Sequence, residues 1–238
     1  MKKLIVLCMA LVLFVACKKT KKEEIAEVRE IQQYSIAQFM DNENAFANGY
    51  SSDKSNILMT SNRSGIFNMY TTPASGGALT PITKSDSASI FGISYFPEDD
   101  RILFRMDGNG DEIYKIYMKD GDEIKDVRAL FNGWAKDRKS FYYASNERDP
   151  RYMDRYEMDL ETLTPKMIYQ IEEGFDFAGM SEDKKYIALL SPINTNDSDL
   201  YVLNTETGVK TKVNDAVSGN SPQDFSPDGT YLYYTTDD

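Results

Sequence analysis

The chain has 238 residues, a formal net charge of −11 at pH 7, two cysteines and no histidine. The acidic balance argues against nucleic acid as a partner, because phosphate binding needs a basic surface. The lack of histidine excludes a Ser-His-Asp triad and any histidine-containing zinc site within these residues.

The first 16 residues predict a signal peptide rather than part of the fold. Lys2 and Lys3 precede an apolar run over 4–16, too short to span a bilayer but typical of a signal-peptide core. Cys17 follows directly, and the stretch 14–17 resembles a bacterial lipobox. The resemblance implies cleavage before Cys17 and acylation of its thiol, with a plain secretory signal as the alternative. We therefore expect export to the cell envelope and attachment to a bacterial membrane by a lipid anchor, facing the periplasm or the cell surface.

The next segment, 17–36, is predicted to be a charged tether. It begins with lysines, continues with glutamates and contains neither proline nor glycine. Ile25, Val28 and Ile31 lie at helical spacing, so a short helix and a mobile spacer both fit the pattern. We expect the first strand to begin near 34–36.

Residues 37–238 are predicted to form a β-propeller, because one pattern recurs every 39 to 46 residues. In each copy a large apolar residue stands three positions before an acidic residue, and an apolar run follows. Strand-rich repeats of this length are typical of propellers in which each repeat forms one four-stranded blade. The predicted fold class is all-β, with four complete repeats and half of a fifth. The apolar and acidic members are Tyr50 and Asp53, Tyr95 and Glu98, Trp134 and Asp137, Met180 and Asp183, and Phe225 and Asp228.

Each acidic residue is expected to occupy the turn between the first and second strands of its blade. The clearest copy is the stretch 226–229, Ser-Pro-Asp-Gly, whose residue types all favour turns. A tyrosine recurs in the third strand, and we expect it to pack between blades together with the apolar residue before the turn. A single active site does not need the same residue repeated in every blade. A structural role is therefore favoured for the acidic, apolar and tyrosine positions of the repeat. The four tyrosines are Tyr70, Tyr117, Tyr156 and Tyr201.

The fifth repeat reaches only its second strand before Asp238, and the residues before the first turn supply a single strand. We therefore expect an incomplete propeller, truncated from a longer chain.

No catalytic, cofactor or metal site is predicted. A G-x-S-x-G elbow and a glycine-rich phosphate loop are both absent from the sequence. The loop 107–112 resembles the start of a calcium loop, but Glu112 stands where that loop needs glycine and Met118 where it needs glutamate. The loops between second and third strands should share one face of the disc, which is a candidate surface for a partner or substrate. They span 61–65, 107–112, 145–151 and 194–199.

Several stretches resemble the prolyl oligopeptidase family of serine peptidases. The segments are 34–40, 94–103, 133–151 with 154–156, and 196–201, and the resemblance covers roughly 34–238. It implies an N-terminal propeller followed by a C-terminal α/β-hydrolase domain that holds the catalytic serine, aspartate and histidine. The propeller then caps the active site and restricts entry to short or unfolded peptides. None of the catalytic residues can be carried onto this chain.

Two functions follow as hypotheses. In the first, the chain is the lipid-anchored propeller of such a peptidase, inactive alone, with the hydrolase domain and peptides as partners. In the second, it is an envelope protein that binds another protein, because its repeats are also similar to TolB-type propellers. The pair Glu172 and Glu173 resembles acidic pairs that capture amino termini in some propeller peptidases, but no helix surrounds it, so a solvated loop is expected.

Overall fold

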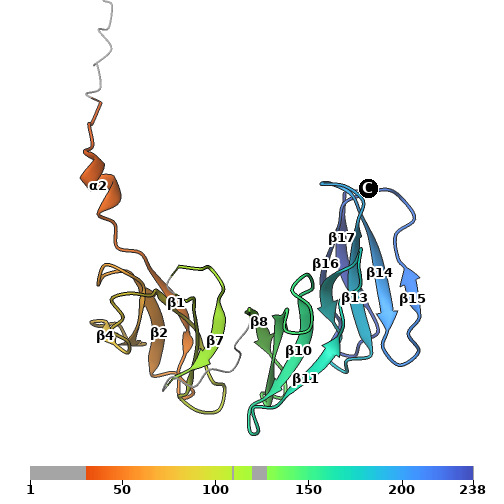
Figure 1. The fold of residues 1–238 in the computed structure, drawn as a ribbon, viewed down its shortest axis with the longest axis horizontal. Coiled ribbons are helices and arrows are strands. Elements are labelled where there is room, and N and C mark those ends of the chain that lie inside the picture. Colours follow the sequence, from red (N-terminus) through yellow and green to blue (C-terminus); the bar gives the residue numbers. More distant parts are fainter. Residues whose placement is uncertain (1–30, 109, 120–127, 238) are drawn as a thin grey trace, which may run out of the picture. The chain divides into compact units, whose positions relative to one another are not determined.

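A computed structural model describes residues 31–108, 110–119 and 128–237 (Figure 1). The chain divides into two units, Met1–Asn42 and Glu43–Asp238. The predicted signal peptide, Cys17 and the tether up to residue 30 lie outside the described residues. Within the described ranges, no helix has the length and apolar character needed to cross a membrane.

The described part of the first unit contains one short helix, α2 (Ile36–Met40). Its N-cap is Ser35, whose Oγ accepts the N–H of Gln38, while the Gln38 side chain accepts the N–H of Ser35. This reciprocal capping box favours a helix over the strand expected near 34–36, and no residue of α2 is buried. The boundary predicted at residue 37 is also shifted, because the β-sheet unit begins at Glu43.

The second unit is all-β, and its sheets are antiparallel meanders in which neighbouring strands are consecutive in sequence. Repeated four-stranded meanders are the blades of a propeller, so the predicted fold class is confirmed. The first blade contains β1 (Ala45–Tyr50), β2 (Asn56–Ser61), β3 (Asn68–Pro73) and β4 (Thr80–Pro81). The second contains, among the described residues, β5 (Ile90–Tyr95), β6 (Ile102–Met106) and β7 (Lys115–Met118).

The later blades repeat the same order. The third blade contains β8 (Ala129–Trp134), β9 (Ser140–Ser145), β10 (Asp154–Asp159) and β11 (Pro165–Tyr169). The fourth contains β12 (Asp176–Met180), β13 (Tyr186–Pro192), β14 (Ser198–Asn204) and β15 (Lys210–Lys212). The fifth sheet contains β16 (Asn220–Phe225) and β17 (Leu232–Thr236). Each recurring tyrosine lies in the third strand of its blade.

The acidic turns share one geometry in four of the five blades. In the first, the Ser51 N–H donates to the Asn56 carbonyl at 2.9 Å, and Asp53 Oδ1 accepts the Ser51 hydroxyl at 2.7 Å and the Ser55 N–H at 2.9 Å. The residue after the aspartate takes a left-handed φ of 59° to 70°. Those residues are Lys54, Arg138, Lys184 and Gly229.

The second turn corrects the prediction for Glu98. Here Asp99, one position later, accepts the Arg101 N–H at 2.9 Å and the Arg101 Nε–H at 3.1 Å. The short side chain of aspartate reaches the backbone two residues on, which the longer glutamate does less well. Glu98 instead lies 3.4 Å from Arg138 of the next turn.

Each of the first three acidic turns contacts the turn of the next blade. The Ser52 N–H and hydroxyl both donate to Asp100 Oδ1 at 3.1 Å, which joins the first turn to the second. Glu98 pairs with Arg138 to join the second turn to the third. Lys136 pairs with Glu182 to join the third turn to the fourth. We call this series of contacts the turn row.

The described first strands all carry a β-bulge, whose unpaired residue lies two positions before the predicted core residue. The register jumps at Ala47/Gly49, Gly92/Ser94, Phe131/Gly133, Phe177/Gly179 and Pro222/Asp224. Gly49 and Gly133 adopt φ values of +124° and +127°, which glycine tolerates best. A bulge bends a strand and increases its twist, so each first strand is bent at the same point.

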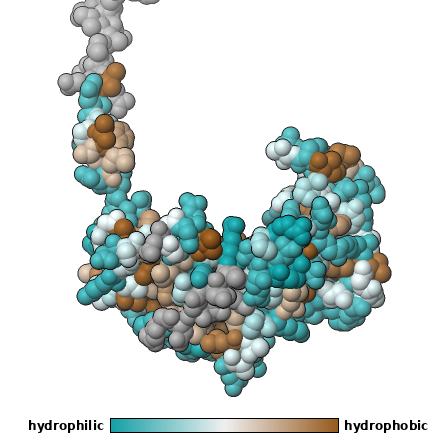
Figure 2. Space-filling model, in the orientation of Figure 1, coloured by the Kyte–Doolittle hydropathy of each residue, from teal (hydrophilic) through white to brown (hydrophobic). Residues whose placement is uncertain are grey.

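The hydrophobic core lies mainly between adjacent blades. One cluster joins Phe96 and Leu103 of the second blade to Phe141 and Tyr143 of the third. Another joins Leu58 of the first blade to residues of the second. In the space-filling view, the visible surface is mostly hydrophilic and its apolar residues form small separate patches (Figure 2).

The predicted core residues differ in burial. The prediction that Tyr50 packs between blades is wrong, because its side chain is exposed. Tyr50 belongs to the first blade described, whereas Tyr95 and Trp134 contact the blade before their own. Tyr95, Phe225, Tyr70 and Tyr156 are buried, and Trp134, Met180, Tyr117 and Tyr201 are half-buried.

Candidate binding site between the third and fourth blades

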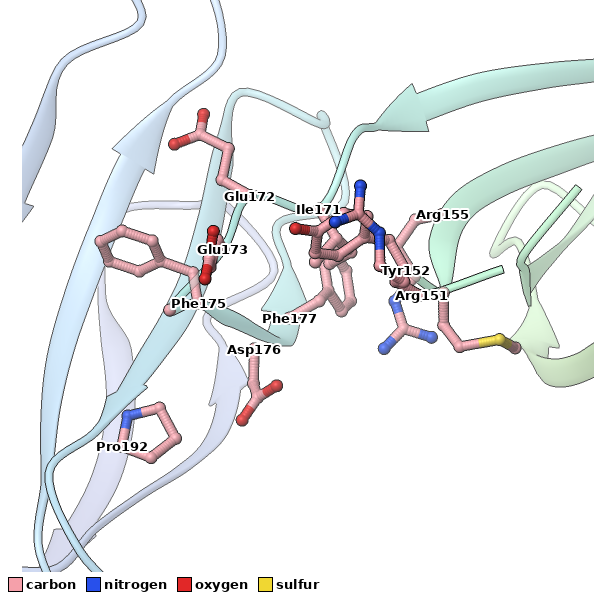
Figure 3. Close-up of a pocket in the computed structure, with 12 residues that line it drawn as sticks. Arg151, Tyr152, Arg155, Ile171, Glu172, Glu173, Phe175, Asp176, Phe177 and Pro192 are labelled. Atoms are coloured by element: carbon pink, nitrogen blue, oxygen red, sulfur yellow. The ribbon is translucent and has the colours of Figure 1, made fainter. Parts of the chain in front are cut away.

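A cavity of about 580 Å³ lies where the third blade meets the fourth. Three segments line it: 151–153 with Arg155, the crossover 171–177 between β11 and β12, and Pro192 at the end of β13. Figure 3 shows Arg151, Tyr152 and Arg155 on one side and Glu172, Glu173 and Phe175 on the other. Arg151 is the last residue of the loop 145–151, one of the loops expected to share a partner-facing surface.

A buried carboxylate fixes the loop that precedes the cavity. Asp154 is fully buried and accepts hydrogen bonds from Arg148 Nε at 2.5 Å and Nη2 at 3.0 Å. Its Oδ1 also accepts the Ile171 N–H at 2.8 Å, so one side chain ties β10 to both flanking segments. The hydrogen bonds to Asp154 raise the pKa of Arg148. This fork geometry is the strong form of an arginine–carboxylate pair.

Two guanidinium groups flank Tyr152 at the mouth of the cavity. Arg148 lies 5.5 Å and Arg151 5.1 Å from the centre of the Tyr152 ring. Arg151 is itself paired with Asp149, through Nε at 3.1 Å and Nη2 at 2.8 Å. Hydrogen bonds from Arg151 lower the pKa of Asp149 to about 2. Both arginines at the mouth therefore already have protein carboxylates as partners.

Arg155 is held differently from its two neighbours. Its guanidinium lies 4.7 Å from the centre of the Phe177 ring and donates from Nη1 to Asn132 Oδ1 at 3.0 Å. Its Nε–H is buried and has no acceptor among the residues that the structure describes. Burial lowers the pKa of Arg155, and the charge of Asp176 only partly offsets that effect. Among the described residues, Arg155 forms no ion pair.

The acidic side of the cavity is partly neutralised. Lys210 of β15 pairs with Glu172, and its Nζ also lies 4.4 Å from the centre of the Phe175 ring. Phe175 packs edge-on against Tyr201 at 5.4 Å. Glu173 is exposed on the same crossover. The geometry agrees with a solvated loop more than with an amine-capturing pair, since Glu172 already has a cationic partner.

The other polar loops satisfy their own backbones. Asp111 Oδ1 accepts the N–H groups of Gly108 at 3.0 Å and Ile113 at 2.9 Å. Asn194 Oδ1 accepts those of Asn196 at 2.8 Å and Asp197 at 3.0 Å. In the part of the chain that the structure describes, no group of three or more His, Cys, Asp or Glu side chains could hold a metal ion.

The residues predicted from the repeats do not converge on one site, because each lies in its own blade. The cavity residues were missed, apart from the loop 145–151 and the pair Glu172 and Glu173. A signal for Arg155 exists in the sequence. It directly precedes the recurring Tyr156, and the residues preceding the other three tyrosines are all apolar: Met69, Ile116 and Leu200.

Comparison with known proteins gives a family match. The model of the prolyl oligopeptidase N-terminal beta-propeller domain matches residues 82–238. No curated protein sequence matches the chain significantly.

Solved structures with a similar fold include two types of protein. TolB from Acinetobacter baumannii is 19% identical with a TM-score of 0.50, over 80% of this chain and 48% of that one. A putative TolB from Agrobacterium tumefaciens is 19% identical with a TM-score of 0.50, over 82% of this chain and 71% of that one. Prolyl oligopeptidase B from Galerina marginata is 12% identical with a TM-score of 0.56, over 80% of this chain and 29% of that one. The chain therefore spans about half of the first structure and less than a third of the last.

Proposed function

Because the chain belongs to the prolyl oligopeptidase family through its N-terminal β-propeller domain, we propose that it is the propeller of a lipid-anchored serine peptidase, where it covers the active site and gates the entry of peptides. The family match over 82–238 carries this proposal. The match covers a propeller domain only, so in this proposal the acyl-transfer chemistry belongs to a separate hydrolase domain.

The residues of this chain have a limited part in such a reaction. The sequence holds no histidine and no G-x-S-x-G elbow, so a nucleophile and its base must come from the hydrolase domain. The propeller would contribute size selection and a surface on which a peptide is oriented before it reaches the reacting groups. The cavity between the third and fourth blades supports this role, because it combines aromatic walls with charged side chains.

The lipid anchor is the second part of the proposal. It rests on Cys17 at the end of the apolar run, which lies outside the described residues. Attachment at Cys17 would hold the propeller close to a bacterial membrane.

One observation favours a second candidate function. Two TolB structures match 80% and 82% of the chain at a higher identity than the peptidase does. On this alternative, the propeller is a protein-binding module of the cell envelope and never contributes to hydrolysis.

The native polypeptide separates the two functions. Antibodies against residues 43–237 would recover it from an envelope fraction, and a fluorophosphonate probe would then report a reactive serine on the same polypeptide. We expect labelling, together with cleavage of short peptides but not of folded proteins. A heat-denatured sample is the control for nonspecific labelling. An unlabelled polypeptide that co-purifies with a stable protein partner would instead support the binding module.

A further inference from the structure

One position in the blade repeat departs from its pattern only in the third blade. The residue before the recurring tyrosine is Met69 in the first blade, Ile116 in the second and Leu200 in the fourth, and each is at most 1% exposed. In the third blade this core position holds Arg155. A charged group at a position that is apolar in the other blades is costly to bury, so its presence here points to a task that an apolar side chain could not perform.

The protein satisfies this guanidinium incompletely. An arginine carries five N–H donors, and among the described residues only Nη1 of Arg155 has an acceptor, the Oδ1 of Asn132. The Phe177 ring lies 4.7 Å from the guanidinium carbon and has no oxygen or nitrogen that could accept a hydrogen bond. The neighbouring arginines are different, since Arg148 is paired with Asp154 and Arg151 with Asp149. Within the described ranges, Arg155 is therefore the guanidinium of this cavity that lacks a carboxylate partner.

We propose that Arg155 anchors a carboxylate-binding subsite in the cavity between the third and fourth blades, which takes a peptide bearing a single carboxylate beside an aromatic or aliphatic side chain. A carboxylate is the acceptor whose planar, bidentate geometry best matches a guanidinium edge. The choice of a peptide as the ligand rests on the proposed role in gating peptide entry.

The surroundings select for a single negative charge. Glu172, Glu173 and Asp176 are exposed at the rim of the same cavity, and Lys210 neutralises only the first of them. A dianionic group such as a phosphate would meet these carboxylates and be repelled. A monocarboxylate would be repelled less by these acidic side chains and can reach Arg155. It would then serve as the carboxylate partner that Arg155 lacks among the described residues.

The cavity walls select the group next to the carboxylate. Tyr152, Phe175 and Phe177 contribute rings to the lining, and Ile171 adds an aliphatic surface (Figure 3). A volume of about 580 Å³ admits one or two residues of a peptide rather than a folded domain. The subsite therefore fits the end of a peptide chain or a short acidic segment.

Peptide binding to the full chain tests this proposal by calorimetry. The probes are N-acetyl-Ala-Ala-Phe with a free carboxylate, the same peptide as its amide, and N-acetyl-Ala-Glu-Phe amide. The free acid is expected to bind, and its amide to bind at least tenfold more weakly. The glutamate peptide distinguishes the source of the carboxylate: affinity equal to the free acid indicates a side chain, and affinity equal to the amide indicates a chain terminus. Both results support the subsite.

Two variants assign the binding to Arg155. Arg155→Leu restores the apolar residue of the other blades and should weaken binding of the free acid at least tenfold. Arg105→Leu is the matched control: this exposed guanidinium contacts Phe91 and Tyr114 outside the cavity, and its loss should change affinity less than twofold. If Arg155→Leu does not fold, Arg155→Gln replaces it.

The proposal is overturned if the wild-type chain does not bind the free acid at millimolar concentration. It is also overturned if the folded Arg155 variant binds the free acid as tightly as the wild type does. Because no hydrolase takes part in the assay, binding can be found even where the native polypeptide fails to react with fluorophosphonate. The failure of the subsite and the failure of the peptidase role are thus separate results.

Discussion

The indole Nε1–H of Trp134 donates a hydrogen bond to Ser94 Oγ at 3.3 Å. This contact joins the first strand of the third blade to the first strand of the second. The Trp134 ring also lies 5.2 Å from Phe96 and 5.7 Å from Phe141, so it packs against both blades. The hydrogen bond and the ring contacts together give Trp134 a structural role at this junction.

Truncating this side chain should destabilise the junction. We expect Trp134→Ala to lower the free energy of unfolding by about 3 kcal/mol, because it removes packing on both blades. Trp134→Phe keeps most of the ring contacts and loses the hydrogen bond, so it should cost about 1 kcal/mol. Urea unfolding of both variants measures the difference. Equal stability of Trp134→Ala and the wild type would contradict the packing role.

The buried carboxylate of Asp154 gives a second prediction. Arg148→Met should lower the free energy of unfolding by about 3 kcal/mol, because it leaves Asp154 charged and buried without its partner. The double variant Arg148→Met, Asp154→Asn removes both charges and should recover part of the loss. A double-mutant cycle by urea unfolding measures the coupling, and additive effects would show that the two side chains act independently.

The acidic turns predict a dependence of stability on pH. The backbone N–H of Ser55 and the hydroxyls of Ser51 and Ser55 donate to Asp53 and lower its pKa from 3.8 to about 2. A lowered pKa in the folded state stabilises the fold above the unfolded pKa of about 3.9. That contribution disappears as the pH falls from about 4 to about 2.

Asp53→Asn provides the measurement. Its stability should lie below that of the wild type at pH 7, and the gap should shrink as the pH falls through this window. Asp86→Asn is the control, because the exposed Asp86 carboxylate accepts no hydrogen bond within the described ranges. A gap that stays constant with pH would show that the Asp53 charge does not contribute.

Arg155→Leu is expected to raise the free energy of unfolding by about 1 kcal/mol. The substitution removes a half-buried charge with an unpaired Nε–H and inserts the residue type found at Leu200. Arg105→Leu on the exposed surface should change stability by less than about 0.5 kcal/mol. A large loss of stability in Arg155→Leu would mean that the contacts with Asn132 and Phe177 outweigh the cost of burial.

The lipid anchor is tested by Cys17→Ala. The variant lacks the thiol that the proposed acylation needs, so it should leave the membrane fraction while the wild type stays in it. Metabolic labelling with a fatty-acid analogue gives an independent measurement, and only the wild type should be labelled. Retention of Cys17→Ala on membranes after a high-salt wash would rule out this anchor.

The repeat period was enough to predict the blades, because a turn acid and a strand tyrosine recur at almost constant spacing. The repeat period does not determine which residue holds a turn or where a helix is capped, because both depend on the hydrogen bonds of single side chains. Asp99 rather than Glu98 holds the second turn, and the Ser35–Gln38 capping box makes a helix where a strand was expected. The bulges were missed because the type of the unpaired residue differs from blade to blade, from Asn48 to Gln223.

The candidate site was harder to predict than the fold. The sequence marked the polar loops of one face, but the cavity depends on how the crossover 171–177 lies against β10. Arg155 could have been found by aligning the repeats with each other, since it is a charged residue in an otherwise apolar column. The lack of a carboxylate partner for Arg155 could not have been predicted in this way, because it depends on where every neighbouring carboxylate lies in space.

The turn row has a consequence for how such an array can change in evolution. The second turn is linked to the first through Asp100 and to the third through Glu98, and both of these groups are carboxylates. A second blade copied by gene duplication would therefore place Glu98 of one copy near Asp100 of the other, where two negative charges repel. The blades of this array are not interchangeable at their turns, and a copied blade would need a compensating substitution at the new joint.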